Sequence, residues 1–234
     1  TNPDSLTSWL QEDFKIGSSR PFGSLPGNPP GVPPDATISL GTYNGMTDLL
    51  SLRDPQSNLA AVDFLKQVKP RYLYVTGHSL GGTLTPPLFA YLNAMLYGGS
   101  TITNMALWSF AGLTPGGSGF NNYFNKLIPN NQGFLWRLHN TLDVAPFLWY
   151  SLEDVKKIYD FSPYFLKWGV IERGALEYLF GEAAKSGIDY SQPQAGQALQ
   201  GQFDTAYSDT WALQGMHQHS SITYQQLVNA LYPL

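Results

Sequence analysis

The stretch that decides the fold is residues 72–82, which read YLYVTGHSLGG. Its first five residues are apolar enough for a buried strand, and a helical pattern follows it. Between them lies G-x-S-x-G, the pattern of a serine held in strained geometry at a sharp strand-to-helix turn. Gly77 and Gly81 flank Ser79, and we expect a Cβ at either glycine to clash across so tight a turn. The context predicts a nucleophilic serine; the alternative is a turn whose serine only caps the helix.

The composition limits the number of domains and the classes of partner and site that this chain can have. The 234 residues suffice for one large α/β domain, and charged residues make up only 13% of them. A net charge of −4 without a basic run argues against a nucleic-acid partner. The chain has no Cys, which excludes disulfides and thiolate metal sites. No apolar run approaches the roughly 20 residues of a membrane span.

Strand and helix patterns alternate along the chain. This order predicts a mostly parallel sheet with right-handed crossovers and helices on both faces. Pro86 and Pro87 should kink their helix or end its first turn. The strands are fewer than such a sheet usually carries, so we expect N-terminal strands before Thr1 to be absent from this chain. The expected strands are 71–76, 102–110 and 134–139; the expected helices are 45–68 with a break near 54–55, 80–97, 152–187 and 221–231, with a loop-dominated stretch at 188–210.

A serine hydroxyl needs a base, and that base needs an orienting acid. In α/β-hydrolases the chain order is Ser, acid, His, and the groups stand at the carboxyl ends of the strands. Asp143 fits the acid because it follows the strand 134–139, although it could also be a turn residue bonding its own backbone. Asp154 and Asp160 are weaker candidates because they lie in or near helical segments.

Four histidines are available as the base. His78 is too constrained inside the turn, and His139 lies in a strand, where we expect it to be packed. His217 and His219 stand in an expected loop before the last helix, and composition does not choose between them. A metal site built on this His-x-His is the minor alternative, because no other ligand cluster accompanies it.

Three segments resemble the class 3, fungal-type triacylglycerol lipases and their bacterial relatives, over nearly the whole chain. These are the elbow VTGHSLGG at 75–82, FAGLTPG at 110–116, and the segment 137–146, which carries the acid at Asp143. The family's base segment is similar to QHS at 218–220 followed by Tyr224, which favours His219 over His217. The resemblance implies an α/β-hydrolase fold in a single domain over 1–234.

The resemblance also assigns residues outside the triad. Thr1 is similar to the family's oxyanion-hole residue after a strand-ending Arg-Gly, with Asp13 or Glu12 holding it. It would share the oxyanion with the backbone N–H of Leu80. Residues 5–16 resemble the lid, with Trp9 on its apolar face, and we group His78 with Trp9 as substrate-binding residues. The strand before Thr1 would be missing from this chain, and either absent altogether or supplied by a separate N-terminal fragment of the same protein. Residues 152–215 are long for the family and predict an extra helical cap.

The expected function is ester hydrolysis by Ser79, Asp143 and His219, with neither cofactor nor metal. The resemblance implies a triacylglycerol lipase, which takes lipid or ester substrates and contacts a lipid–water interface. A short-chain carboxylesterase, a phospholipase or a thioesterase could use the same triad. A catalytically silent lipase-fold scaffold is the alternative from a different class. Aromatic residues in 147–168 read either as core or as an acyl groove.

Overall fold

A four-stranded parallel sheet forms the centre of the computed structural model, which describes residues 15–97, 104–127, 135–160, 170–194 and 196–231. The strand order is β3 (Tyr72–His78), β4 (Asn104–Phe110), β6 (Leu135–Asn140) and β8 (Gly196–Leu199). In register, His78 pairs with Phe110, and Phe110 with Leu138. The carboxyl ends of β3, β4 and β6 therefore meet at one edge of the sheet, as the alternating pattern predicted.

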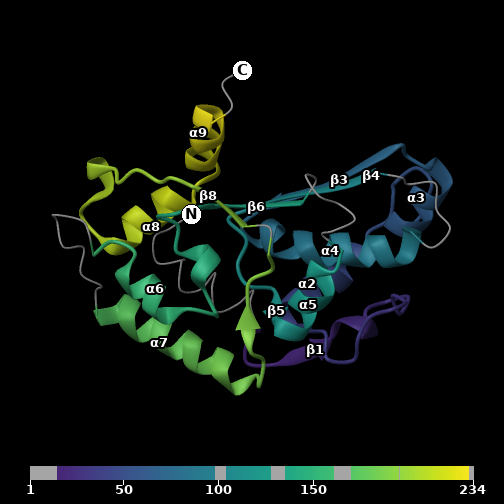
Figure 1. The fold of residues 1–234 in the computed structure, drawn as a ribbon, viewed down its shortest axis with the longest axis horizontal. Helices are drawn as coiled ribbons and strands as arrows, with labels where there is room; N and C mark the ends of the chain where they lie inside the picture. The colour runs from purple at the N-terminus through teal and green to yellow at the C-terminus, as the bar shows by residue number, and fades with distance from the viewer. Residues whose placement is uncertain (1–14, 98–103, 128–134, 161–169, 195, 232–234) are drawn as a thin grey trace.

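Helices cover both faces of this sheet (Figure 1). On one face, Val75, Met105 and Leu107 pack in a core with α4 (Leu80–Tyr97), α2 (Leu40–Ser51) and α5 (Ser118–Asn125). On the other face, α9 (Ser221–Leu231) packs Tyr224 against Leu138. The second face of β3 is covered only in part, because Tyr72 and Tyr74 are 47% and 59% exposed, so the expectation of a buried strand holds for one face of β3 only. The short α3 (Ala61–Val68) precedes β3.

Helix α4 continues through two prolines. Pro86 and Pro87 lie inside its bounds Leu80–Tyr97, so the prediction that they could end the first turn is wrong. Pro86 has no N–H to donate to the carbonyl of Gly82. The hydroxyl of Ser109 in β4 donates to that carbonyl instead, at 2.8 Å. The sheet thus satisfies the acceptor that the proline leaves open.

A second, antiparallel sheet was not visible in the sequence pattern. Its order is β1 (Ser19–Pro21), β2 (Thr37–Ser39), β5 (Gly116–Gly117) and β7 (Tyr190–Ser191). Each strand has only two or three residues, which is too short for an alternating pattern. This sheet joins segments that are far apart in sequence beside the main sheet.

The segment between the acid and the base builds a second core. It contains α6 (Leu152–Lys157), α7 (Val170–Lys185), β7, β8 and α8 (Trp211–His219). Trp149, Tyr159 and Trp211 are buried there, so these described aromatic residues form core rather than a groove. The expected loop over 188–210 is wrong in part, because β7 and β8 lie within it. The expected loop around His217 and His219 is also wrong, because both belong to α8.

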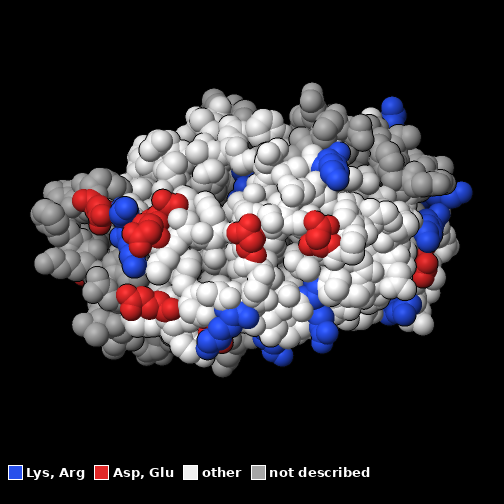
Figure 2. All heavy atoms as spheres, turned by 60° about the horizontal axis from the view of Figure 1, so that its bottom comes forward, with Lys and Arg blue, Asp and Glu red and all other residues white. Residues whose placement is uncertain are grey.

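Charged side chains are sparse on the surface. On the face that Figure 2 shows, Lys, Arg, Asp and Glu are scattered among uncharged residues. Among the helices of the described ranges, none is long and apolar enough to cross a membrane.

Candidate active site

Ser79 stands alone between the end of β3 and the start of α4. Its φ of 61° lies in the left-handed region, which is unfavourable for a residue with a Cβ. Two backbone bonds hold it there: its N–H donates to the carbonyl of Phe110 at 3.0 Å, and its carbonyl accepts from the N–H of Thr83 at 2.9 Å. The strained strand–turn–helix geometry predicted from the pentapeptide is therefore present.

Of the clashes expected at Gly77 and Gly81, the structure shows only the one at Gly77. A Cβ on Gly77 would lie 2.4 Å from the backbone of Gly81, so no side chain fits there. A Cβ on Gly81 would meet no described atom within 4 Å, which contradicts the expected clash. The other close approach is at Gly82, where a Cβ would lie 2.3 Å from the carbonyl oxygen of Phe110. Gly82 thus faces β4, whereas no described atom approaches the Cβ position of Gly81 at the start of α4.

The three predicted triad residues come together from distant parts of the chain. His219 Nε2 lies 2.8 Å from Ser79 Oγ. His219 Nδ1 lies 2.9 Å and 3.1 Å from the two carboxylate oxygens of Asp143. Because a carboxylate accepts, Nδ1 carries the proton and Nε2 is left to accept from the serine hydroxyl. This arrangement can withdraw a proton from Ser79.

Asp143 is fully buried and held by groups other than His219. The backbone N–H of Ala145 donates to its Oδ1 at 2.9 Å, and the hydroxyl of Tyr224 donates to its Oδ2 at 2.8 Å. The Tyr224 hydroxyl also accepts from the backbone N–H of Asn140 at 2.9 Å. Tyr224 thus ties the carboxylate to the end of β6. In the sequence, Tyr224 marks only the segment of the base, because a contact across 81 residues leaves no local signal.

The surroundings of His219 act on its pKa in opposite directions. Burial lowers the pKa, whereas the charge of Asp143 and the hydrogen bond to it raise it, and the net effect is a raised pKa. The side chain is only 18% exposed. The neighbouring carboxylate therefore stabilises a protonated His219, as a base that must hold a proton during the reaction requires.

The other candidates for acid and base lie elsewhere. His217 stacks on Tyr207, with ring centroids 4.2 Å apart, and its Nε2 lies 3.5 Å from Asp204. His217 and His219 therefore do not share one site. Among the described residues, no group of three or more His, Cys, Asp or Glu could hold a metal ion. Asp154 and Asp160 are exposed in and after α6.

The predicted oxyanion and lid residues are described only in part. Leu80 is the first residue of α4 and follows Ser79, so its backbone N–H has no acceptor within the helix. Thr1, Trp9 and nearly all of the lid segment 5–16 lie outside the described residues. His78 is described, and its ring lies against His219.

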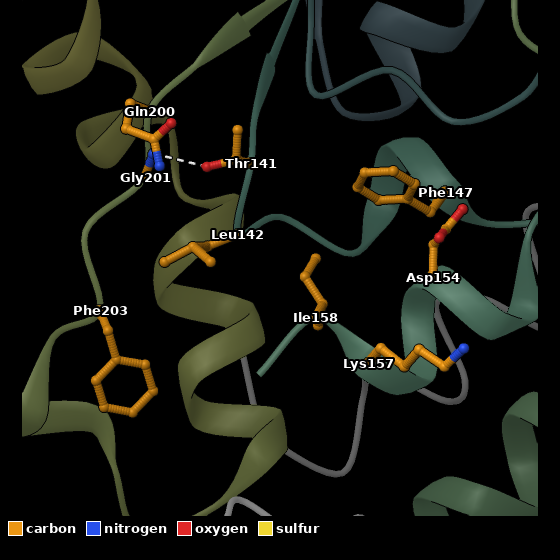
Figure 3. Close-up of a pocket in the computed structure, with 9 residues that line it drawn as sticks. All are labelled: Thr141, Leu142, Phe147, Asp154, Lys157, Ile158, Gln200, Gly201 and Phe203. Atoms are coloured by element: carbon orange, nitrogen blue, oxygen red, sulfur yellow. Dashed lines mark hydrogen bonds between the residues drawn. The ribbon is translucent and has the colours of Figure 1, made fainter. Parts of the chain in front are cut away.

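A pocket of about 460 Å³ lies beside the acid loop (Figure 3). Leu142, Phe147, Ile158 and Phe203 give it apolar walls, and Asp154 and Lys157 line it with charge. The backbone N–H of Gly201 donates to Thr141 Oγ1 at 2.9 Å on one side of this pocket. Ser79, Asp143 and His219 are not among its lining residues.

Comparison with solved structures finds lipases. M37 lipase matches 98% of this chain and 67% of its own chain at a TM-score of 0.81 and 26% identity. Lip2 lipase from Yarrowia lipolytica is 18% identical over 56% of this chain and 44% of its own, at a TM-score of 0.43. A triacylglycerol lipase from Penicillium expansum is 21% identical over 51% of this chain and 42% of its own, at a TM-score of 0.39.

Comparison with protein-family models and with curated protein sequences finds no match. The chain spans about two thirds of the length of M37 lipase. The match to M37 lipase extends over nearly all of this chain, including both sides of the elbow. The chain therefore has the α/β-hydrolase fold, in the form that M37 lipase adopts.

Proposed function

We propose that this chain is a serine ester hydrolase of the lipase type, which forms an acyl-enzyme on Ser79. The observation that carries the proposal is the unbroken line from Ser79 Oγ through His219 to Asp143, with separations of 2.8 and 2.9 Å. Ser79 lies on a strained turn at the carboxyl end of β3. The carboxyl ends of the strands are where α/β proteins place reacting groups.

The acylation step uses each of these groups. Ser79 Oγ attacks the ester carbonyl carbon while His219 Nε2 takes the hydroxyl proton. Asp143 keeps Nδ1 protonated and stabilises the imidazolium that forms. The backbone N–H of Leu80 donates to the oxyanion, and the N-terminus of α4 adds a favourable field. When the C–O bond to the alcohol breaks, His219 returns its proton to the leaving oxygen.

Deacylation repeats the sequence with water. His219 accepts a proton from the water as it attacks the acyl carbonyl, and then gives that proton back to Ser79. The products are a carboxylic acid and the enzyme in its starting state. A second oxyanion donor at Thr1 and a lid carrying Trp9 remain predictions, and removal of one such donor typically costs about 10²–10³ in rate.

Lipid esters are the proposed substrates, taken up at a lipid–water interface. The extended likeness to M37 lipase supports this choice. Short-chain carboxylesterase, phospholipase and thioesterase activities are the other outcomes open to the same triad.

The experiment compares hydrolysis of soluble p-nitrophenyl butyrate with hydrolysis of emulsified triolein. A lipase turns over the emulsion, whereas an esterase prefers the soluble ester. Ser79→Ala should abolish both activities, and Ser57→Ala, an exposed serine between α2 and α3, is the matched control. Full hydrolysis by Ser79→Ala would overturn the mechanism. A folded wild-type chain that hydrolyses no ester or thioester would favour the silent scaffold.

A further inference from the structure

The pocket beside the acid loop has apolar walls that the proposed reaction does not use. Its volume of about 460 Å³ falls within the roughly 300–1,000 Å³ of small-molecule sites. The segment 200–203, which follows β8, borders one side, and Phe147 and α6 border the other, with Leu142 and Ile158 between them (Figure 3). The pocket therefore offers an apolar chain a place between two separate parts of the fold.

Two charged residues of opposite sign line the α6 side of this pocket. Asp154 and Lys157 stand three residues apart on α6, and both are exposed. Asp154 accepts from the hydroxyl of Ser151, and Lys157 lies 3.9 Å from Glu153. A carboxylate ligand would meet the charge of Asp154 and an amine that of Lys157, whereas a hydroxyl can donate to the first and accept from the second. This side of the pocket therefore favours a neutral head group that carries hydroxyls.

Buried amides join the two walls of the pocket. The backbone N–H of Leu142 donates to Asn140 Oδ1 at 3.0 Å, and Asn140 Nδ2 donates to Gln218 Oε1 at 2.7 Å. Gln218 Nε2 in turn donates to the carbonyl of Gln202 at 2.7 Å. The side chains of Asn140 and Gln218 are fully buried. Hydrogen bonds that solvent does not reach thus set the spacing between the acid loop and the segment 200–203.

The same walls adjoin two members of the proposed triad. Leu142 directly precedes Asp143, and Gln218 directly precedes His219. The pocket and the short contacts from His219 to Ser79 and Asp143 occur in one conformation. A ligand shifts a protein toward the state that it binds. A molecule that fits between these walls at this spacing therefore stabilises the arrangement of acid and base as well.

We propose that this pocket is a lipid site apart from the triad, which binds a neutral single-chain amphiphile of the monoacylglycerol class and thereby favours the assembled triad. The chain lies against Leu142, Ile158 and Phe203, and the hydroxyls of the head group lie between Asp154 and Lys157. The inference rests on the proposed function, because stepwise hydrolysis of lipid glycerides releases such an alcohol. The reaction would then respond to its own product.

The experiment uses 1-O-decylglycerol, an ether that the triad cannot hydrolyse, below its micelle concentration. Calorimetric titration of the full chain measures binding, and the rate at which a fluorophosphonate labels Ser79 measures the coupling. We expect saturating ether to raise the labelling rate about fivefold, near the lower end of usual couplings between sites. Decanoate and decylamine should bind about tenfold more weakly, because each places its charge beside a like charge on α6.

Two substitutions act on the pocket without touching the triad. Ile158→Trp fills the space, and Lys157→Met removes the donor to the head group. Each should weaken binding of the ether about tenfold and leave the labelling rate without ether unchanged. Lys156→Met is the matched control, because Lys156 is the neighbouring residue of α6, lies 3.4 Å from Glu153 and is not among the lining residues. It should bind the ether like the wild-type chain.

Several results would overturn the proposal. A folded wild-type chain that does not bind the ether would do so, as would equal weakening by Lys156→Met and Lys157→Met. If Ile158→Trp does not fold, Lys157→Met decides. Unchanged or slower labelling at saturating ether would overturn the coupling, and tighter binding of decanoate would overturn the head group. A wild-type chain that binds the ether but neither hydrolyses esters nor becomes labelled would overturn the proposed function and the coupling, and support the binding site alone.

Discussion

Replacing Tyr224 by Phe tests how the carboxylate of Asp143 is held. The substitution removes one hydroxyl and leaves the ring, which packs against Phe110 and His78. That hydroxyl donates to Asp143 Oδ2 at 2.8 Å and accepts from the N–H of Asn140 at 2.9 Å. Both partners are fully buried. One atom therefore satisfies two groups that have no access to solvent.

The cost follows from those two bonds. A hydrogen bond to a charged group contributes about 1.5–3 kcal/mol, and a buried N–H left without an acceptor costs about 1–3 kcal/mol. Because such terms do not simply add, we expect the free energy of unfolding to fall by about 3 kcal/mol. For a chain of this size each kcal/mol lowers Tm by about 2–4 °C, so the expected drop is about 6–12 °C.

Tyr224→Phe should also change the pH dependence of kcat/KM. The hydroxyl stabilises the charge of Asp143, so its loss makes the carboxylate a stronger partner for His219. The pKa of His219 is already raised by Asp143 and should rise further, which moves the acid limb of the profile to higher pH.

Thermal unfolding and a pH–rate profile measure both effects. Tyr159→Phe is the matched control, because its buried hydroxyl donates to the carbonyl of Leu142 at 2.9 Å and not to the carboxylate. It should lose about 1 kcal/mol and leave the acid limb in place. A Tyr224→Phe variant with the stability of Tyr159→Phe and an unmoved acid limb would refute the reasoning.

Two further predictions concern the elbow and the base. Gly82→Ala should destabilise the fold by about 1–3 kcal/mol, because its Cβ would meet the carbonyl of Phe110, whereas Gly81→Ala should be neutral or stabilising by up to about 1 kcal/mol. Urea unfolding compares them, and equal losses would contradict the assignment of the close approach to Gly82. Asp143→Asn removes the causes that raise the pKa of His219 and leaves burial, so that pKa should fall below its ordinary value of about 6.5. An NMR titration of His219 measures it, and an unchanged pKa would show that Asp143 does not control the base.

The residues of the site that local patterns and chain order define could be predicted from the sequence. The pentapeptide around Ser79 specifies a turn by itself, and the parallel topology places whatever follows β6 at the same edge. Asp143 and a histidine near α9 could therefore be found without coordinates. The choice of His219 over His217 came from the resemblance alone. It agrees with the structure, in which α8 directs only His219 toward Ser79.

Features defined by tertiary pairing were not predictable. Strand β8 has the sequence GQAL, with little β-propensity, and it exists because it pairs with β6 in register from Arg137 to Asn140. The continuation of α4 through Pro86 depends on Ser109, a residue in another strand. The role of Tyr224 likewise depends on partners that are far away in sequence.

Labelling with a fluorophosphonate tests the central claim most directly, because only an activated serine reacts with it. The wild-type chain should acquire one adduct, mapped by mass spectrometry to the peptide containing Ser79. His219→Ala should slow the labelling strongly, and His217→Ala should label at the wild-type rate, since His217 faces Tyr207 and Asp204. An adduct on another serine, or labelling of Ser79 that is indifferent to His219, would contradict the account.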